Sequence, residues 1–307
     1  MKVFVTGGTG FLGYYLVQEC IKKNFDITCF VRKNALKVKK ELCYSFTKQG
    51  VKLVVGDVTD SVSLSNAFKK KHYDLIFHLA GIYATHDETI QVNVDGTKNI
   101  LTAFVENQNY PKRFVFMSST GAMGPVKSTK PLNEETECKP ENVYEISKYD
   151  AENVVKNFGE INHVIIRAPR IFGANDPQNT FSFFKKFAKI GVFPIISNFP
   201  FSLVYVKNLI HGILLASKKK KAVRNTYIIA DKKSYATKEI ALAIADTLKI
   251  KRRTYLTIPR TAVKTISLIT NSYRYGLHNV RYSIEKAKKD LHYKPKYELL
   301  DAMKETF

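Results

Sequence analysis

The hydrophobic positions of the chain fall into short, continuously apolar runs that alternate with longer amphipathic segments. Runs such as 75–77 and 164–166 are apolar on both faces, which is typical of strands covered on both sides in a parallel sheet. The segments between the runs carry apolar residues at helical spacing. The pattern predicts strands at 2–6, 26–31, 51–55, 74–79, 112–117 and 162–167, and helices near 11–23, 35–48, 61–71, 89–107 and 142–158.

Alternation of strand and helix over the first half of the chain indicates an α/β fold with a doubly wound parallel sheet. After Arg167 the pattern becomes less regular and prolines interrupt it. We expect a domain over 1–167 and a smaller C-terminal lobe over 168–307, of which about 203–230 returns to the sheet. In this second part the sequence predicts helices near 206–217, 237–248, 261–271, 283–290 and 297–306, and a strand near 226–229.

The first predicted strand runs straight into glycines. Gly7, Gly10 and Gly13 follow it at intervals of three, and the helical spacing begins at Phe11 and Leu12. A strand that turns into a helix through glycines aims the unpaired N–H groups of the helix at the turn, which favours phosphate binding. Gly7 permits the turn, Gly10 lets the backbone approach a pyrophosphate, and Gly13 lets the helix pack closely. This context predicts a Rossmann-type dinucleotide site, and the alternative is a glycine turn without a ligand.

The end of the second strand indicates which dinucleotide binds. An acidic residue there suits the ribose 2′-hydroxyl of NAD, and an arginine suits the 2′-phosphate of NADP. Val31 occupies the acidic position, and the cations Arg32 and Lys33 follow it. The sequence therefore favours NADP, with NAD possible if Arg32 only faces solvent.

Composition bounds the class of protein. The 307 residues are 45% hydrophobic, as in ordinary globular proteins, and contain no apolar run of 18 that would span a membrane. Met1 lies almost directly on the first strand, so no signal peptide is expected. Four cysteines without paired spacing suggest reduced thiols. These features predict a cytoplasmic protein without integral membrane contact.

The formal charge of +22 raises the question of nucleic-acid binding. The lysines are spread along the chain, in groups such as 69–71 and 218–221, and most fall where helix ends or solvent faces are expected. This distribution favours a generally basic surface over a dedicated nucleic-acid site. A weaker interpretation is attraction to anionic metabolites or to a membrane surface.

Tyr144 and Lys148 form a candidate catalytic pair. They are four positions apart on one face of a predicted helix, and Ser119 follows the fifth strand 25 residues before Tyr144. A free tyrosine has a pKa of about 10, so work near neutral pH requires a shift of about 3 units, or roughly 4 kcal/mol. A lysine ammonium one turn away favours the phenolate. The alternative is an ordinary surface pair.

No other catalytic constellation competes. The seven histidines show no metal-ligand spacing, so no metal site is predicted. The G-x-S-x-G turn of hydrolases and the G-x-x-x-x-G-K-[ST] loop of P-loop proteins are both absent from the sequence.

Together these motifs resemble the extended short-chain dehydrogenase/reductase family, which includes the NAD-dependent epimerases and dehydratases. Further matching segments are Asp57-Val58, His78-Leu79-Ala80-Gly81, Asn93-Val94-Asp95-Gly96-Thr97, Arg167 to Gly173, Tyr205 to Asn208, and Tyr282 to Pro295. The resemblance implies that Ser119 joins Tyr144 and Lys148 in the catalytic group and holds the substrate oxygen, and that Lys148 also bonds the nicotinamide ribose. The cofactor contacts that it implies are Gly7, Thr9, Gly10, Phe11, Leu12, Gly13, Arg32, Lys33, Asp57, Val58, Leu79, Ala80, Gly81, Asn93, Tyr144, Lys148 and Pro169.

Departures from the family pattern narrow the reaction. Dehydratases of the family carry an acidic residue soon after the serine, whereas residues 120–124 here contain none. Many epimerases carry an asparagine where this chain has Arg170. The segments at 167–173 and 205–208 look closer to the 3β-hydroxysteroid dehydrogenase-like and dihydroflavonol reductase-like branch. Seven phenylalanines are candidates either for an apolar substrate pocket or for the core of the small lobe: 181, 183, 184, 187, 193, 199 and 201.

The leading hypothesis is therefore an NADP-dependent oxidoreductase that transfers hydride at a carbonyl or secondary alcohol carbon. A nucleotide-sugar epimerase with tightly bound NAD is the alternative, and a non-catalytic or redox-sensing protein of the same fold is a third. The substrate, a small molecule, is expected to meet Tyr83, Ser119, Thr120 and Arg170. The family also implies a homodimer through the helices near 89–107 and 142–158.

Overall fold

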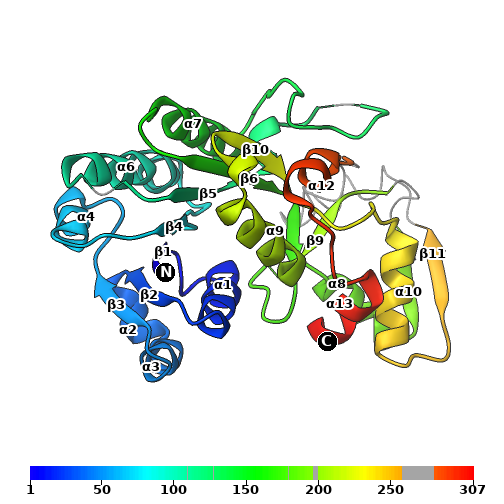
Figure 1. The fold of residues 1–307 in the computed structure, drawn as a ribbon. Coiled ribbons are helices and arrows are strands. Elements are labelled where there is room, and N and C mark those ends of the chain that lie inside the picture. Colours follow the sequence, from blue (N-terminus) through cyan, green and yellow to red (C-terminus); the bar gives the residue numbers. More distant parts are fainter. Residues whose placement is uncertain (109, 127, 179, 196–199, 258–279) are drawn as a thin grey trace.

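The computed structural model describes residues 1–307 except 109, 127, 179, 196–199 and 258–279 (Figure 1). A parallel sheet fills one half of the molecule, and a C-terminal lobe lies against one end of it. Within the described residues, no helix is both long enough and apolar enough to cross a bilayer.

Seven parallel strands form the central sheet, in the order β10-β6-β5-β4-β1-β2-β3. The order reverses between β1 and β4, as in doubly wound folds. Because every pair is parallel, the carboxyl ends of the strands meet at one edge. The strands are β1 (Lys2–Thr6), β2 (Asp26–Val31), β3 (Lys52–Val55), β4 (Leu75–His78), β5 (Arg113–Ser119), β6 (His163–Ala168) and β10 (Asn225–Ile228).

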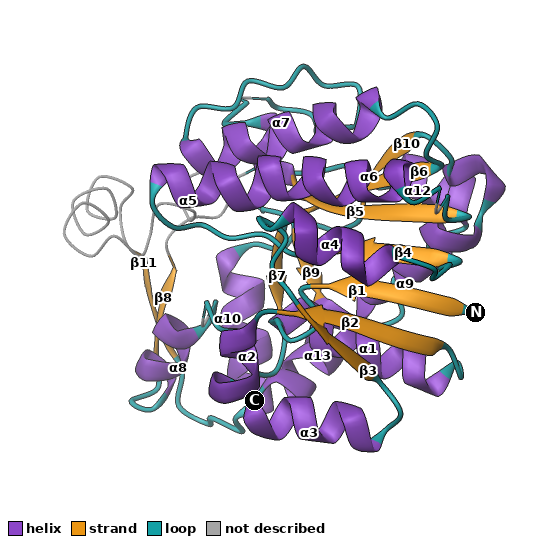
Figure 2. Cartoon of the chain, turned by 90° about the vertical axis from the view of Figure 1, so that its left-hand side faces the viewer, coloured by secondary structure: helices purple, strands orange, loops and turns teal. Residues whose placement is uncertain are grey.

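Helices cover both faces of this sheet, which explains its continuously apolar strands (Figure 2). On one face the apolar cluster joins the strands to α4 (Ser61–Phe68), α6 (Gly96–Glu106) and α7 (Val143–Asn157). On the other it joins them to α1 (Phe11–Lys22), α3 (Lys40–Lys48), α9 (Val206–Lys218) and α12 (Glu285–Leu291). The remaining helical elements of this half are α2 (Lys33–Val38), α5 (His86–Ile90), the π-helical turn η1 (Gln91–Asp95), and the 3₁₀ turns η2 (Thr120–Met123) and η3 (Lys220–Ala222).

The C-terminal lobe has its own apolar core and two small parallel sheets, β7 with β9 and β8 with β11. The β8–β11 pair stands apart from the central sheet (Figure 2). Phe181, Phe184 and Phe193 are buried in this core, which favours the core interpretation for these three, whereas Phe199 and the side chain of Phe183 lie outside the described residues. The elements of the lobe are β7 (Arg170–Phe172), α8 (Ser182–Ala188), β8 (Val192–Ile195), β9 (Leu203–Tyr205), α10 (Thr237–Thr247), β11 (Thr254–Thr257) and α13 (Leu299–Thr306).

Most predicted elements are confirmed within two or three residues, but the single helix over 35–48 is wrong. The backbone of Lys39 leaves the helical region, with φ −121° and ψ 39°, and divides the segment into α2 and α3. Five further elements were not predicted, namely β7, β8, β9, β11 and α8. The helix predicted near 261–271 lies outside the described residues, and the boundary at 167/168 stays a prediction.

Candidate functional site

The glycine turn after β1 leaves no room for side chains on its protein side. Gly7 has a φ of +72°, and a Cβ there would lie 2.8 Å from the backbone of Ala80. A Cβ on Gly13 would lie 2.1 Å from the carbonyl oxygen of Gly7. A Cβ on Gly10 would meet only that same oxygen, at 3.1 Å. Side chains at these positions would fill the space beside the turn, and their absence fits the close approach of a pyrophosphate to the backbone.

The first turn of α1 opens directly from the glycine turn. Gly10 is its N-cap and has no side chain to bond the first amides of the helix. The side chains of Phe11 and Leu12 pack against the apolar core of the C-terminal lobe, and that of Leu12 also packs against the core of the sheet. The helix therefore offers N–H groups and the positive end of its dipole to an anion.

A cation that was not predicted from the sequence bonds the glycine turn. The Nζ of Lys39 donates a hydrogen bond to the carbonyl oxygen of Thr9, at 3.0 Å. Arg32 and Lys33 follow β2 and are exposed. Lys39 is one lysine among many in the sequence. Its position depends on the break between α2 and α3, which hydrophobic spacing does not reveal.

A buried histidine joins the ends of β1 and β4. His78 Nδ1 lies 2.7 Å from Thr6 Oγ1, and its Nε2 lies 3.1 Å from Thr97 Oγ1. The hydroxyl of Thr6 also accepts a hydrogen bond from the Ala80 amide, at 3.2 Å. Burial, with a smaller contribution from the charge of Lys148, lowers the pKa of His78 to about 3. The ring is therefore a neutral structural link under the site.

This histidine makes stability depend on pH. The folded protein keeps His78 neutral down to about pH 3, whereas in the unfolded chain it binds a proton below about pH 6.5. The unfolded state therefore binds more protons in this window, and the free energy of unfolding falls as the pH decreases. For this one group we expect a loss of about 2 kcal/mol between pH 7 and pH 5.

Urea denaturation at a series of pH values measures this loss. The variant His78→Gln should reduce the pH slope by about one proton. The matched variant His72→Gln, at an exposed position, should leave the slope unchanged. An unchanged slope in His78→Gln would contradict the prediction.

Asn93 holds the loop after β4 against α7. Its Oδ1 accepts from the Ile82 amide and its Nδ2 donates to the Ile82 carbonyl, both at 2.9 Å. The same Nδ2 lies 2.9 Å from Ser147 Oγ on α7. Asn93 lies in the π-helical turn η1, and such turns often mark functional sites. The loop, η1 and α7 are therefore fixed to one another beside the predicted site.

Lys148 is buried under this loop. Its Nζ donates to the Met117 carbonyl oxygen at 3.2 Å, and a Cβ added to Gly81 would lie 2.7 Å from it. Asn93 Oδ1 would lie 3.2 Å from the same Cβ. Burial lowers the pKa of Lys148 to about 8, against a smaller opposite effect of the Glu152 charge. Near neutral pH the lysine can therefore carry or release a proton.

The side chains of Ser119 and Tyr144 both lie close to Gly121. A Cβ built on Gly121 would lie 3.2 Å from Ser119 Oγ and 3.5 Å from Tyr144 Cε1. Ser119 Oγ accepts a hydrogen bond from the Gly121 amide at 2.9 Å, so its own proton stays available to another acceptor. A capping box of Asn142 and Glu145 fixes the start of α7, and with it Tyr144. The ring of Tyr83 packs edge-on against the Tyr144 ring, with centroids 5.7 Å apart.

A buried ion pair below the site was also not predicted. Arg167, at β6, makes two hydrogen bonds to the Glu152 carboxylate of α7, at 2.8 and 2.6 Å. Ser118 Oγ donates to the same carboxylate at 2.6 Å. The sequence shows each charge separately, and only the packing of β5, α7 and β6 brings them together.

The remaining predicted residues make contacts of their own at several places in the fold. Asp57 Oδ1 accepts from the amide and the hydroxyl of Thr59, which closes its own turn. The buried side chain of Val58 packs against Gly96. Arg170 Nε donates to Thr180 Oγ1 at 3.1 Å, in a loop of the C-terminal lobe. Thr120, Pro169 and Leu79 are wholly or partly buried at the same strand ends, and the assigned roles of all these residues stay predictions.

Neither described hollow coincides with this group. One of about 500 Å³ lies at the outer end of the C-terminal lobe, and one of about 390 Å³ lies beside the loop before α7. Neither is lined by Ser119, Tyr144 or Lys148. Among the described residues, no group of three or more His, Cys, Asp or Glu side chains could hold a metal ion.

Comparison with known proteins agrees with the fold and the motifs. The family model described as "NAD dependent epimerase/dehydratase family" matches residues 3–230. An uncharacterized protein, y4nL, of Sinorhizobium fredii is 30% identical over 253 residues, or 78% of this chain and 70% of that protein. The GDP-6-deoxy-D-talose 4-dehydrogenase of Aggregatibacter actinomycetemcomitans is 29% identical over 165 residues, which are 52% of this chain and 48% of the relative.

A solved structure supports the same architecture. The crystal structure of UDP-glucuronic acid 4-epimerase from Bacillus cereus in complex with NAD superposes with a TM-score of 0.79. It is 19% identical, and the alignment covers 100% of this chain and 97% of that one. At this identity the likeness concerns the fold alone.

Proposed function

Because the chain belongs to the NAD dependent epimerase/dehydratase family, we propose that it is an NADP-dependent oxidoreductase acting on a carbonyl or a secondary alcohol. The observation that carries the proposal is the approach of Ser119 and Tyr144 to the same glycine, with Lys148 buried on the same helix as Tyr144. Members of this family are enzymes, so the open questions are the reaction and the cofactor.

The residues present fit a nicotinamide dinucleotide. Gly7, Gly10 and Gly13 would hold its pyrophosphate at the start of α1, where a side chain would collide or intrude. Asn93 and Lys148 would face its nicotinamide half. When bound, the cofactor supplies or accepts a hydride at the carbon of the carbonyl or alcohol.

The chain itself handles the proton. In carbonyl reduction, Tyr144 donates its phenol proton to the substrate oxygen as that oxygen becomes a hydroxyl, and alcohol oxidation reverses this transfer. The Lys148 ammonium stabilises the phenolate left on Tyr144. Ser119, whose oxygen already accepts from the Gly121 amide, donates a hydrogen bond to the substrate oxygen and keeps that oxygen beside Tyr144.

The charges after β2 support NADP. Val31 occupies the acidic position, Arg32 and Lys33 follow it, and Lys39 adds a third cation, which bonds the glycine turn. A 2′-phosphate is stabilised by such cations, whereas a ribose hydroxyl gains little from them.

This proposal predicts how cofactor affinity responds to a charge change. Arg32→Ala should raise the Kd of NADPH about tenfold, or about 1.4 kcal/mol, and leave the Kd of NADH nearly unchanged. Titration calorimetry measures both constants. Lys37→Ala, at an exposed cation within α2, is the matched control. Tighter binding of NADH than of NADPH, unaffected by Arg32→Ala, would show that NAD is the cofactor.

We propose that the substrate is a ketone or a secondary alcohol, and that the chain belongs to the branch that resembles 3β-hydroxysteroid dehydrogenases and dihydroflavonol reductases. Residues 120–124 hold no carboxylate for a dehydratase step, and Arg170 stands where many epimerases have asparagine. The buried phenylalanines of the lobe lend this branch no support. The proposal therefore depends on the sequence of 167–173 and 205–208.

A panel of steroid-like, flavonoid-like and simple ketones, with nucleotide sugars beside them, tests this proposal. An oxidoreductase should consume NADPH in proportion to the alcohol formed. An epimerase should keep its dinucleotide through purification and interconvert a nucleotide sugar without net change in nicotinamide absorbance. That second result would replace the proposed reaction.

We also propose that the protein is a cytoplasmic homodimer that pairs through α5–α6 and α7. Ile146 on α7 is 37% exposed and would be covered in such a pair. Sedimentation equilibrium gives the mass in solution, and a monomer at all concentrations would refute the dimer.

A further inference from the structure

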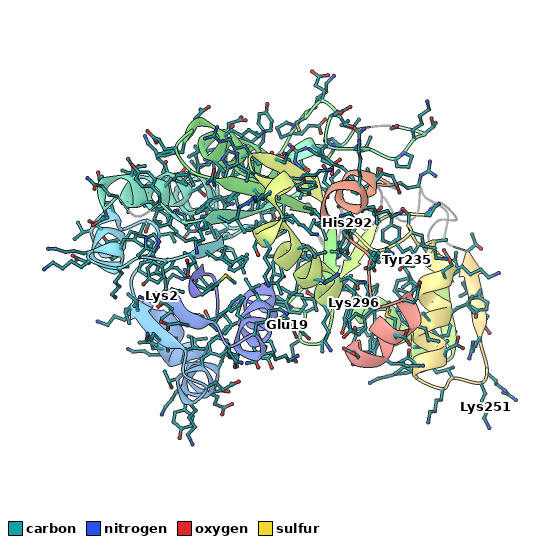
Figure 3. The ribbon with its side chains drawn as sticks, viewed as in Figure 1. Lys2, Glu19, Tyr235, Lys251, His292 and Lys296 are labelled. Atoms are coloured by element: carbon teal, nitrogen blue, oxygen red, sulfur yellow. The ribbon has the colours of Figure 1, made fainter. Side chains whose placement is uncertain are left out.

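The outer end of the C-terminal lobe brings two distant turns together. The turn after α8 and the turn after α10 meet where the Thr254 amide donates to the Gly191 carbonyl, at 2.8 Å. A Cβ on Gly191 would lie 2.6 Å from the carbonyl oxygen of Arg252. We call residues 185–191 together with 248–256 the lobe tip. Figure 3 shows Lys251 at the outermost part of this tip.

The lobe tip is strongly basic. It holds five lysines and two arginines, all of them exposed or partly exposed. The sequence contains no acidic residue in 177–230 or in 247–284. Asp246, next to the tip, forms an ion pair with Arg253 at 2.7 Å. The basic residues of the tip are Lys185, Lys186, Lys189, Lys249, Lys251, Arg252 and Arg253.

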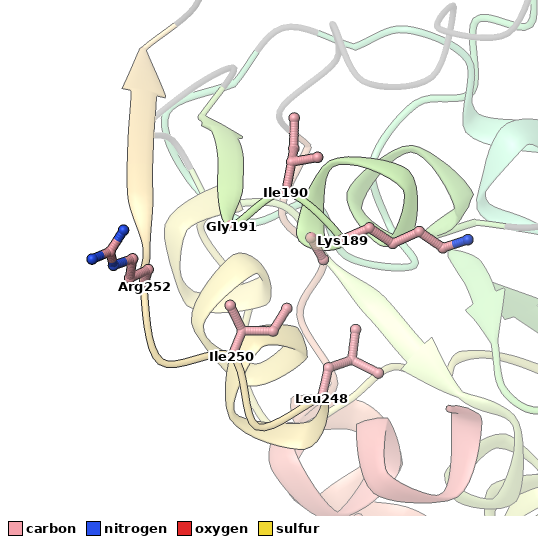
Figure 4. A pocket seen from close by; sticks show the side chains of 7 residues that line it. Lys189, Ile190, Gly191, Leu248, Ile250 and Arg252 are labelled. Carbon is pink, nitrogen blue, oxygen red and sulfur yellow. The ribbon is translucent and has the colours of Figure 1, made fainter.

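Apolar side chains stand exposed among these cations. Ile190 is 72% exposed, Leu256 is 53% exposed and Leu248 is 37% exposed. Ile190, Leu248 and Ile250 line the hollow of about 500 Å³ between the two turns (Figure 4). Clustered apolar side chains at a charged surface mark an interaction site more often than scattered ones do.

We propose that the lobe tip docks on an anionic lipid surface, with Ile190 and Leu248 entering the headgroup region and the cations facing lipid phosphates and carboxylates. Peripheral membrane binding requires apolar insertion together with basic charge, and the tip supplies both within two adjoining turns. The inference concerns where the protein resides and does not depend on the chemistry of Tyr144.

Two other occupants fit the tip less well. Single-stranded nucleic acid is bound by aromatic side chains on which bases stack, whereas the exposed apolar residues here are aliphatic. A second copy of the chain docked tip to tip would bring two basic surfaces together, and like charges oppose such a contact.

Flotation with lipid vesicles tests the proposal on the full-length protein. We expect binding to vesicles of phosphatidylcholine with phosphatidylserine, no binding to phosphatidylcholine alone, and weaker binding at high salt. Ile190→Ser should weaken binding several-fold at unchanged net charge. Because Ile190 is mostly exposed, this variant should keep the wild-type melting temperature.

A matched pair of charge variants separates a local site from overall charge. One double variant, Lys189→Gln/Arg252→Gln, changes the lobe tip, and the other, Lys220→Gln/Lys221→Gln, changes residues outside it. Each lowers the formal charge of the protein from +22 to +20. We expect the first to lower vesicle affinity about tenfold and the second to lower it less than about threefold.

Several results would overturn the proposal. Equal losses in the two charge pairs, or full binding by Ile190→Ser, would mean that overall charge alone attracts the protein. Absence of binding to the anionic vesicles would refute it directly. Tight binding to a single-stranded RNA that is lost in Ile190→Ser, or self-association that is lost in that variant, would assign the tip to another occupant. Cofactor binding should stay the same in every variant, so failure here leaves the proposed function untouched.

Discussion

Replacing Tyr144 by phenylalanine lowers kcat on the order of a thousandfold, within the range that proton transfer by a positioned side chain contributes. The change removes one oxygen and leaves the ring that packs against Tyr83 and Gly121. The fold and the dinucleotide affinity should therefore stay the same. Single-turnover oxidation of NADPH with the best substrate of the panel measures the loss.

Tyr149 on the same helix provides the control for this experiment. It is a partly buried tyrosine outside the proposed group, and Tyr149→Phe should retain wild-type turnover. If Tyr144→Phe were as active as Tyr149→Phe, the assignment of Tyr144 as the proton donor would fail. The NADPH affinity of the Tyr144→Phe variant would still test the proposed role of the glycine turn. The two halves of the proposal can therefore fail independently.

Replacing Gly10 by alanine should weaken dinucleotide binding tenfold to a hundredfold, or by about 1.4 to 2.7 kcal/mol, without unfolding the protein. The backbone of Gly10, with φ −78°, suits any residue, and its added Cβ would meet only one oxygen of the protein, at 3.1 Å. The methyl group would instead occupy the space into which the pyrophosphate has to come. Fluorescence titration with NADPH and thermal denaturation measure the two effects.

Variants of two other glycines provide the comparisons for this result. Gly159→Ala adds a Cβ with no atom within 4 Å and should change neither affinity nor melting temperature. Gly13→Ala would press its Cβ to 2.1 Å from the Gly7 carbonyl oxygen, so it should displace α1 and lower the melting temperature as well. Wild-type affinity in Gly10→Ala would show that no ligand approaches this side of the turn.

Short-range patterns were enough to predict the central sheet. Its strands are continuously apolar because helices cover both faces, so each strand is visible in its own few residues. The glycine turn is also local, and its predicted steric roles agree with the positive φ of Gly7 and the tight packing of Gly13.

The C-terminal lobe and the supporting contacts of the site could not be predicted in this way. The strands β8 and β11 are four residues each and pair across about sixty residues of sequence, so neither has a local signal. Lys39 reaches Thr9 because the backbone leaves the helix at one residue, and Arg167 meets Glu152 across two elements. Such contacts come from tertiary packing, which a single sequence does not display.

The π-helical turn η1 limits how this chain can change in length. A π turn contains one residue more than the α-helical turn it replaces, and each residue turns a helix by about 100°. Deleting one residue between Gln91 and Asp95 would restore a regular helix and rotate Asn93 away from Ile82 and Ser147. Insertions and deletions tolerated elsewhere on the surface should therefore be rejected in this segment, even where the deleted residue touches nothing in the site.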